Sequence, residues 1–324
     1  MELPRRDVAT DLGLVLLAVI WGVNFSVLKF VLREVEPLAV NALRFPLAAV
    51  ALWFLVRRLP GPLAPDREDL PRIVGLGILG HVLYQLMFIF GLNWTLAGNA
   101  SLLLATSPVW TVIFSTARGH ERADLRVLAG VVGTLAGVSL VILGSANGIE
   151  VGSQTLRGDL LILLSAALWA SYTVGGRSPV RRYGPLRITA WTLWVGTPPM
   201  VLLGLPSLLR TDLREVSLGA WLGIAYAGLF AITIAYLLWY RGVQRLGNNR
   251  TAVYSNLVPV AALLTAWAWL GEAPTALQLV GAAVILGGLT LARLARSPDP
   301  THADGATPGT RSRSHPPERS PTEP

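Results

Sequence analysis

The stretch Trp21-Gly-Val-Asn-Phe-Ser-Val-Leu-Lys29 decides the fold, because it closes a run of apolar residues that carries no charge from Leu12 until Lys29. About 20 apolar residues at a rise of ~1.5 Å cross a hydrocarbon core of ~30 Å, so the run predicts a membrane-spanning helix. It also contains an indole, an amide and a hydroxyl group, those of Trp21, Asn24 and Ser26. Such groups are costly in lipid unless they face the protein interior or a wet cavity, and they therefore indicate a functional path.

Composition extends this interpretation to the whole chain. Its 324 residues are 52% hydrophobic and only 14% charged, which leaves too little polar surface for a soluble protein of this length. The net charge of +8 comes from arginines between apolar runs, where membrane orientation explains them, so we expect a lipid bilayer and no nucleic acid as partner. The chain has no cysteine and only four histidines, and we expect no metal and no cofactor.

Ten apolar runs predict an all-α integral membrane protein with ten transmembrane helices. The predicted spans are 11–32, 37–56, 72–91, 97–117, 126–145, 158–177, 186–205, 218–240, 250–270 and 275–294. The predicted organisation is an N-terminal segment 1–10, a first five-helix unit 11–145, a linker 146–157, a second unit 158–296 and a disordered tail 297–324 that is poor in large apolar residues.

The arginines predict the orientation. With a cytoplasmic N-terminus, 18 arginines outside the tail fall on the cytoplasmic side and four on the other, so we expect both termini in the cytoplasm of a multi-pass protein of the cytoplasmic membrane. The cytoplasmic ones are Arg5, Arg6, Arg57, Arg58, Arg67, Arg72, Arg118, Arg122, Arg126, Arg177, Arg181, Arg182, Arg187, Arg241, Arg245, Arg250, Arg293 and Arg296; the other four are Arg33, Arg157, Arg210 and Arg214.

The two five-helix units repeat one another. Asp11 and Trp21 recur as Asp159 and Trp169 at an offset of 148 residues. Pro108, with Glu121 13 residues on, recurs as Pro259 with Glu272 at an offset of 151. Because five spans is an odd number, equivalent elements run in opposite directions, which is the inverted repeat typical of secondary transporters.

At this point the sequence resembles a known family. Trp21-Gly-Val-Asn-Phe with Lys29, Arg44 in the second span, and the doubled pair Ser107-Pro108-Val109 with Glu121 and Val258-Pro259-Val260 with Glu272 are similar to the EamA-type branch of the drug/metabolite transporter superfamily. The resemblance covers about residues 11–295. It implies a ten-helix exporter or permease for small metabolites, often amino acids, that works by alternating access.

Polar and aromatic residues on four spans are the candidate substrate-binding residues. The pairs Trp21 with Asn24 and Trp169 with Tyr172 occupy related positions, where each would offer an apolar wall and a hydrogen bond. Packing between helices is the plain alternative. The third span adds His81, Tyr84 and Gln85, and the eighth span adds Tyr236. The alternatives are a buried histidine without a role and an aromatic belt that includes Tyr240, Trp94 and Trp221.

Two prolines predict gates. Pro108 and Pro259 lie inside the fourth and ninth spans, where each removes a backbone hydrogen bond and frees a carbonyl. Polar residues precede each proline and are further candidates for substrate binding: Asn99 and Ser107 before one, Tyr254 and Asn256 before the other. A tolerated kink without a role is the alternative.

Charged residues receive separate expectations. Arg44 lies about two turns inside the second span without an acidic residue at its depth, so it should meet carbonyl groups or an anion such as a substrate carboxylate. Lys29 could snorkel from the end of its helix, and Glu121 and Glu272 should cap helices or pair with arginines. Glycine-rich faces of the fifth and tenth spans predict close helix packing and could also form a homodimer face.

We therefore expect a secondary transporter that moves small amphipathic metabolites, such as amino acids, outward across the cytoplasmic membrane. No Asp or Glu is predicted at mid-membrane, which makes a proton-coupled multidrug or metabolite antiporter the second choice. An integral membrane enzyme lacks a convergent His/Asp/Glu constellation, and a scaffold leaves the polar helix faces unexplained. No nucleotide-binding P-loop is present, because Lys29 is the sole lysine.

Overall fold

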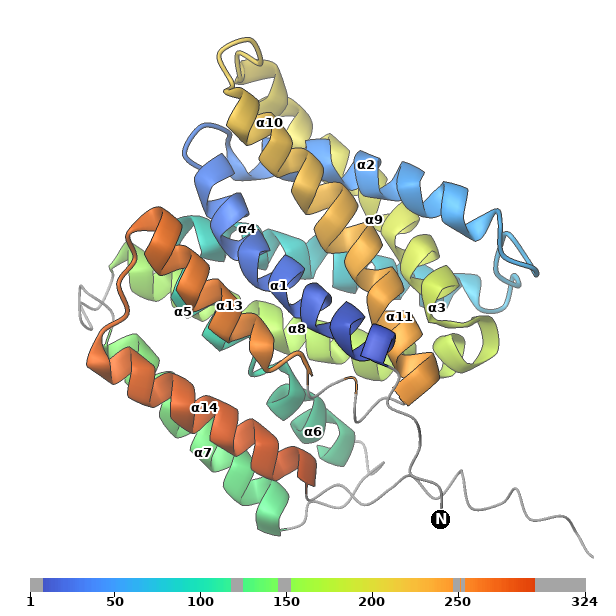
Figure 1. Cartoon of the computed structure of the whole chain (residues 1–324). Helices are drawn as coiled ribbons and strands as arrows, with labels where there is room; N and C mark the ends of the chain where they lie inside the picture. The colour runs from blue at the N-terminus through green and yellow to red at the C-terminus, as the bar shows by residue number, and fades with distance from the viewer. Residues whose placement is uncertain (1–7, 118–124, 145–152, 247–250, 252–253, 295–324) are drawn as a thin grey trace, which may run out of the picture.

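A computed structural model describes residues 8–117, 125–144, 153–246, 251 and 254–294, and these residues fold into a bundle of helices (Figure 1). The elements are α1 Val8–Val31, α2 Pro37–Val56, α3 Leu70–Gly77, η1 Ile78–Leu83, α4 Tyr84–Trp94, α5 Ala97–Leu104, α6 Ser107–Ala117, α7 Leu125–Leu143, α8 Gln154–Tyr183, α9 Pro185–Arg210, α10 Leu218–Ala225, η2 Tyr226–Ile234, α11 Ala235–Leu246, α13 Leu257–Thr265, η3 Ala266–Leu270 and α14 Ala276–Leu294, where η marks a π-helical segment.

The prediction of ten helical spans is confirmed. Within the described residues, seven continuous helical stretches are long and apolar enough to cross a membrane, and three shorter apolar helices complete the ten. The helix ends differ from prediction at one place in particular. The sixth span was expected to end at residue 177, but α8 continues to Tyr183, because the helix ends only where Gly184 adopts a positive φ of 81° that favours glycine.

Local sequence explains several helix starts. Pro37 and Pro185 occupy the first positions of α2 and α9, where a missing N–H costs nothing. Ser153 and Ser217 precede α8 and α10, and their hydroxyl groups accept hydrogen bonds from the backbone N–H groups of Leu156 and Ala220. These caps fix the entry of the chain into helices whose interiors are apolar.

The third and eighth spans share a π-helical segment. η1 begins at Ile78 and η2 at Tyr226, so the two starts lie 148 residues apart, the same offset as in the sequence repeat. The fourth span is also interrupted, between α5 and α6 at residues 105–106, and the ninth has a turn at residues 255–256 before α13. Irregular backbone therefore occurs at equivalent places in the two halves, which is typical of functional sites.

α7 and α14 form a pair at the edge of the bundle, where they lie side by side in Figure 1. A Cβ atom at Gly137 would lie 2.8 Å from the carbonyl oxygen of Gly281, and one at Gly288 would lie 2.7 Å from that of Gly130. The predicted close packing of these glycine faces is thus present within one chain. Because the faces are used internally, they supply no argument for a homodimer.

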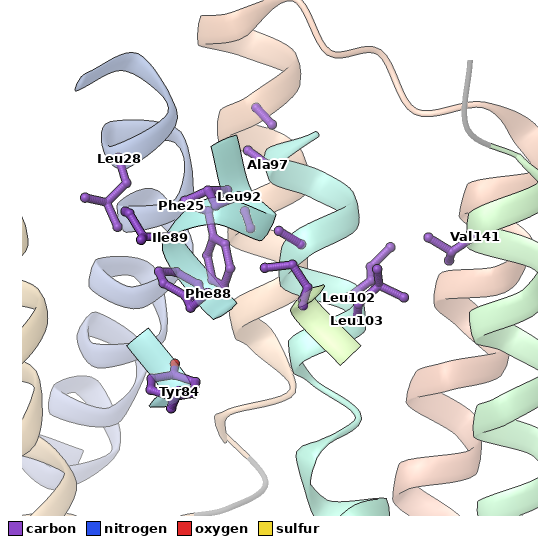
Figure 2. Close-up of a cluster of buried hydrophobic side chains, with 14 of the residues drawn as sticks. Phe25, Leu28, Tyr84, Phe88, Ile89, Leu92, Ala97, Leu102, Leu103 and Val141 are labelled. Atoms are coloured by element: carbon purple, nitrogen blue, oxygen red, sulfur yellow. The ribbon is translucent and has the colours of Figure 1, made fainter. Parts of the chain in front are cut away.

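The interior is built by helices from both halves. α1 packs against α13 and α11, while α8 packs against α4, α5 and α6. Figure 2 shows part of the main apolar cluster, in which Phe25 of α1 meets Phe88 of α4 with ring centroids 5.8 Å apart, and Leu102 and Leu103 of α5 extend it. α1, α4, α8 and α11 therefore surround the middle of the molecule, and their polar side chains form the candidate site.

Candidate functional site

Aromatic side chains of α1 and α11 form one side of the site. The indole N–H of Trp21 donates a hydrogen bond of 2.9 Å to the carbonyl oxygen of Ala231 in η2. The ring of Trp21 lies 6.1 Å from that of Tyr236, edge to face, and Tyr236 stacks on Tyr240 at 6.1 Å. The expectation that Tyr240 belongs to an aromatic belt is wrong, because its hydroxyl bonds Thr189 of α9 in the interior.

Aromatic side chains of α4 and α8 form the opposite side. The ring of Trp169 lies 5.1 Å from Tyr84 and 5.2 Å from Tyr172. The hydroxyl oxygen of Tyr172 lies 3.1 Å from Oγ1 of Thr192, and the hydroxyl of Tyr240 bonds Thr189 one turn earlier in α9, so the two sides meet at α9. We call Trp21, Tyr84, Trp169, Tyr172 and Tyr236 the central cluster.

His81 lies in η1 beside the central cluster. Its Nε2 atom is 3.1 Å from Oγ1 of Thr192 in α9, which is also 3.1 Å from the hydroxyl oxygen of Tyr172. His81 is buried, and its ring lies 5.7 Å from that of Tyr172. The close approach depends on Gly80, because a Cβ atom there would lie 2.5 Å from the Tyr172 ring.

Arg44 of α2 is the cation of the site. It is 2% exposed, and its Nε donates to Oδ1 of Asn41 at 2.9 Å while Nη2 donates to Oε1 of Gln85 at 2.7 Å. Both acceptors are side-chain amide carbonyl oxygens, which agrees with the carbonyl partners expected from the sequence. Gln85 follows Tyr84 directly in α4, which connects the cation to the central cluster.

Asn24 contributes an unused acceptor. Its Oδ1 atom is buried and has no hydrogen-bond partner among the described residues. Because a buried polar atom without a partner is costly, it requires an explanation such as a ligand or water. Asn24 is one helical turn from Trp21, which belongs to the central cluster.

The remaining candidates have other partners. Asn99 accepts a hydrogen bond of 2.7 Å from Gln278 of α14, and the hydroxyl of Tyr254 donates to Asp11 of α1 at 2.7 Å. These bonds join Asn99 to α14 and Tyr254 to α1. Asn256 lies in the turn before α13, where its side chain does not cap the helix.

The two prolines lie at the starts of helix segments, not within continuous helices. Pro108 is the second residue of α6 and Pro259 the third of α13. The carbonyl of Leu104, four residues before Pro108, accepts a hydrogen bond of 2.7 Å from the hydroxyl of Ser107. This freed carbonyl is therefore satisfied locally, and the interruption itself is the feature that a gate would use.

Charged residues gather at the corner between α4 and α5. Lys29 does not snorkel outward but donates three hydrogen bonds, of 2.6 to 2.9 Å, to carbonyl oxygens at the end of α4. Glu272 accepts from the N–H of Ala97 at the start of α5 at 2.8 Å, which agrees with the expected cap. Its partner in the repeat, Glu121, lies outside the described residues.

Asp159 completes this corner. It lies near the predicted start of the sixth span at residue 158, but α8 begins at Gln154, so Asp159 is inside the helix. It is 1% exposed, and its Oδ1 accepts a hydrogen bond of 2.5 Å from the hydroxyl of Thr95. Its Oδ2 has no hydrogen-bond partner among the described residues. Asp159 is the sixth residue of α8, and apart from its match with Asp11 nothing in the sequence indicated that its carboxyl group is buried.

Two further observations limit the chemistry. In the described part of the chain, no group of three or more His, Asp or Glu side chains could hold a metal ion. A hollow of about 420 Å³ lies on the outer face of α2 and α9, lined by Ala49, Val50, Trp53, Phe54 and Trp194. Its apolar lining suits lipid tails, so we assign the functional site to the polar interior instead.

Comparison with known proteins gives this arrangement a context. Residues 9–143 and 156–294 each match the EamA-like transporter family. The chain is 30% identical over 285 residues to a protein of Salmonella typhimurium named "Probable amino-acid metabolite efflux pump", covering 85% of this chain and 91% of that one. It is 28% identical to a "Probable terminal-alkyne amino-acid exporter" of Streptantibioticus cattleyicolor, covering 86% and 91%.

A solved crystal structure shows the same fold. It superposes with a TM-score of 0.62 at 23% sequence identity and covers 87% of this chain and 95% of the other. The two family matches within one chain also support the internal repeat.

Proposed function

Because this chain belongs to the EamA-like transporter family, we propose that it is a secondary transporter that moves small amphipathic metabolites, such as amino acids, outward across the cytoplasmic membrane by alternating access. Membership makes it a multi-pass membrane transporter and not an enzyme. The substrate class and the direction are our proposal. They draw support from two relatives whose names describe amino-acid export.

The observation that carries the proposal is the central cluster. Each of its two aromatic sides joins residues of both halves of the repeat, since Trp21 and Tyr84 belong to the first half and Trp169, Tyr172 and Tyr236 to the second. Inverted-repeat transporters bind their substrates between the halves, near the middle of the membrane. Aromatic walls with adjacent polar groups suit a solute that is partly apolar and partly polar.

The irregular segments supply the movement in this proposal. η1 carries His81 and leads into Tyr84, while η2 accepts the hydrogen bond of Trp21 through Ala231. Rearrangement of a π-helical turn would rotate the side chains that follow it. The interruptions before Pro108 and Pro259 would act as gates at the two ends.

An export assay tests the function. Cells expressing the wild type, Trp21→Ala, Asn24→Ala or Arg44→Ala at matched protein levels are compared for metabolites in the medium. We expect one compound class to accumulate outside with the wild type and to fall by about tenfold in the variants, as loss of one buried interaction predicts. Trp267→Ala is the matched control, because Trp267 is 57% exposed on the outer face.

The outcomes are distinct. If no compound differs between wild-type cells and cells without the protein, with the protein confirmed in the membrane, the export proposal fails. If Trp267→Ala reduces export as much as Trp21→Ala, the central cluster is not the binding site.

Proton-coupled antiport is the second candidate, and Asp159 is the observation that favours it. A buried carboxyl group with one free oxygen, held by Thr95 at the α4–α5 corner, could carry a proton between the two sides. Under this alternative, export by the wild type would stop when an ionophore collapses the proton gradient, and Asp159→Asn would export without responding to that gradient. Export that continues without the gradient favours facilitated diffusion or exchange.

A further inference from the structure

Arg44 carries a charge that the protein does not neutralise. It is the eighth residue of α2, has helix on both sides and is 2% exposed. Its two hydrogen bonds go to the amide oxygens of Asn41 and Gln85, and no ion pair involves it among the described residues. A buried cation is expensive unless an anion compensates its charge. The structure thus holds a positive charge whose natural partner must come from elsewhere.

The same place also has more hydrogen-bond donors than acceptors. A guanidinium group has five N–H donors, and Nη1 of Arg44 makes no hydrogen bond in the described structure. The Nδ2 atom of Asn41 is buried and has no partner within the same residues. Its assignment as nitrogen is secure, because the other amide atom of Asn41 accepts the hydrogen bond from Arg44. An acceptor with negative charge would satisfy both residues.

The aromatic wall adjoins this charge. The ring of Tyr84 in α4 stands 5.1 Å from that of Trp169 and 5.9 Å from that of Phe88. Gln85, the next residue in α4, fixes one side of the guanidinium group. A molecule with an anionic head beside an apolar body would therefore meet donors at one end and aromatic rings at the other.

We propose that Arg44 and Asn41 bind the carboxylate group of the transported molecule, with Gln85 as the positioning residue that orients the guanidinium. The inference rests on the proposed transport function and names its substrate class: amphipathic carboxylates. The contacts of Arg44 and of the central cluster include no Asp or Glu that would meet an ammonium group within the described residues. A carboxylate without an amino group should therefore bind as well as the corresponding amino acid.

Binding to the purified full chain in detergent tests this proposal. The probes are L-phenylalanine, 3-phenylpropanoate, phenylalaninamide and phenethylamine, with sodium chloride and inorganic phosphate as further arms, and the readout is the ligand-induced rise of the unfolding temperature. We expect the two carboxylates to protect the wild type and the amide and the amine to have no effect. Arg44→Gln should weaken carboxylate binding by about tenfold or more, as loss of a charge-assisted hydrogen bond predicts.

Arg57→Gln is the matched control, because it makes the same chemical change on an exposed arginine just after α2, stacked on Trp53. Arg44→Lys keeps the charge but loses the planar fork, and it should bind the carboxylates with intermediate strength. An Arg44→Gln variant that unfolds, without ligand, at or above the wild-type temperature shows that the loss of binding is not a loss of folding.

Four results would overturn the proposal. Equal protection by the amide and the carboxylate removes the role of the charge. Unchanged carboxylate binding by Arg44→Gln removes Arg44 from the site. Protection by chloride or phosphate equal to that by the carboxylates makes the site one for an adventitious ion only. The absence of protection by either carboxylate overturns it as well.

The export assay separates this inference from the proposed function. If Arg44→Gln exports as much as the wild type, the carboxylate site is overturned and the transport function still holds. Binding of carboxylates that depends on Arg44, in a protein that exports nothing from a broad panel, would overturn export and leave the site.

Discussion

A single buried arginine shows how function and stability compete in this fold. Removing the charge of Arg44 should stabilise the protein without ligand, because Gln can still donate to Asn41 from the position of Nε and no longer requires desolvation of a cation. We expect Arg44→Gln to raise the free energy of unfolding by on the order of 1 kcal/mol, measured by thermal unfolding in detergent. Arg57→Gln should leave it nearly unchanged. A large destabilisation by Arg44→Gln would instead make Arg44 a structural residue.

Lys29 gives the opposite expectation. Its ammonium group satisfies the carbonyl oxygens of Leu92, Asn93 and Thr95, which the end of α4 leaves without helical partners. Lys29→Met should therefore cost about 1–3 kcal/mol of stability, whereas Arg33→Met, on an exposed side chain one turn later, should cost little. Equal unfolding temperatures for the two variants would contradict the bonding role of Lys29.

Sequence reasoning reached the identity of many central residues but not their partners. The position of Arg44 inside an apolar run identified it as unusual, and its lack of an acidic neighbour was correct. By contrast, Asn99 and Tyr254 pair with Gln278 and Asp11, residues 179 and 243 positions away in the chain. Such contacts depend on how helices rotate against each other, which helical periodicity alone does not determine.

At the scale of elements, prolines were visible in the sequence and π-helical turns were not. Pro108 and Pro259 mark real interruptions because a residue without an N–H cannot continue the helical ladder. η1 and η2 contain no such residue, and their wider turns arise from packing, as at Gly228, where a Cβ atom would lie 2.8 Å from the carbonyl oxygen of Arg44. Tertiary contact, not local preference, decides these segments.

The loop before α14 couples an ionisable group to the start of α5. Burial raises the pKa of the Glu272 carboxyl group, while the N–H groups of Gly98 and Ala97 and the charges of Lys29 and Arg33 oppose that rise. A raised pKa means that the folded state binds the proton more tightly than the unfolded state. The contribution of Glu272 to stability is therefore full below its ordinary pKa and declines as the pH rises through the raised pKa.

Two variants of Glu272 test this coupling. Glu272→Gln keeps an acceptor for Ala97 and loses the charge, so its stability relative to the wild type should increase from acidic to neutral pH. Glu272→Ala loses the cap and should be less stable than Glu272→Gln by about 1 kcal/mol. Thermal unfolding at several pH values measures both. A difference between wild type and Glu272→Gln that does not change with pH would refute the assignment.

At the scale of the whole molecule, the number of helices followed from composition, since seven long and three shorter apolar helices occupy the predicted spans. The repeat followed from paired motifs such as Trp21 and Trp169. In the central cluster, Trp21 contacts Tyr236 of the second half, and Trp169 contacts Tyr84 of the first half. The arrangement of these helices did not follow, because apolar residues in a membrane protein face both lipid and interior. Exposed Leu202 and buried Leu193 of α9 are indistinguishable by type.

Orientation and inversion can be tested together, because the chain has no cysteine and any introduced one is unique. Arg67, between α2 and α3, and Arg214, between α9 and α10, are both exposed and occupy equivalent loops of the two halves. Inverted repeats place these loops on opposite sides of the membrane, and the excess of arginines places Arg67 inside. A membrane-impermeant maleimide should therefore label Arg214→Cys on intact cells and Arg67→Cys only after permeabilisation. Labelling of both on intact cells would make the repeats parallel, whereas labelling of Arg67→Cys alone would keep the inversion and reverse the orientation.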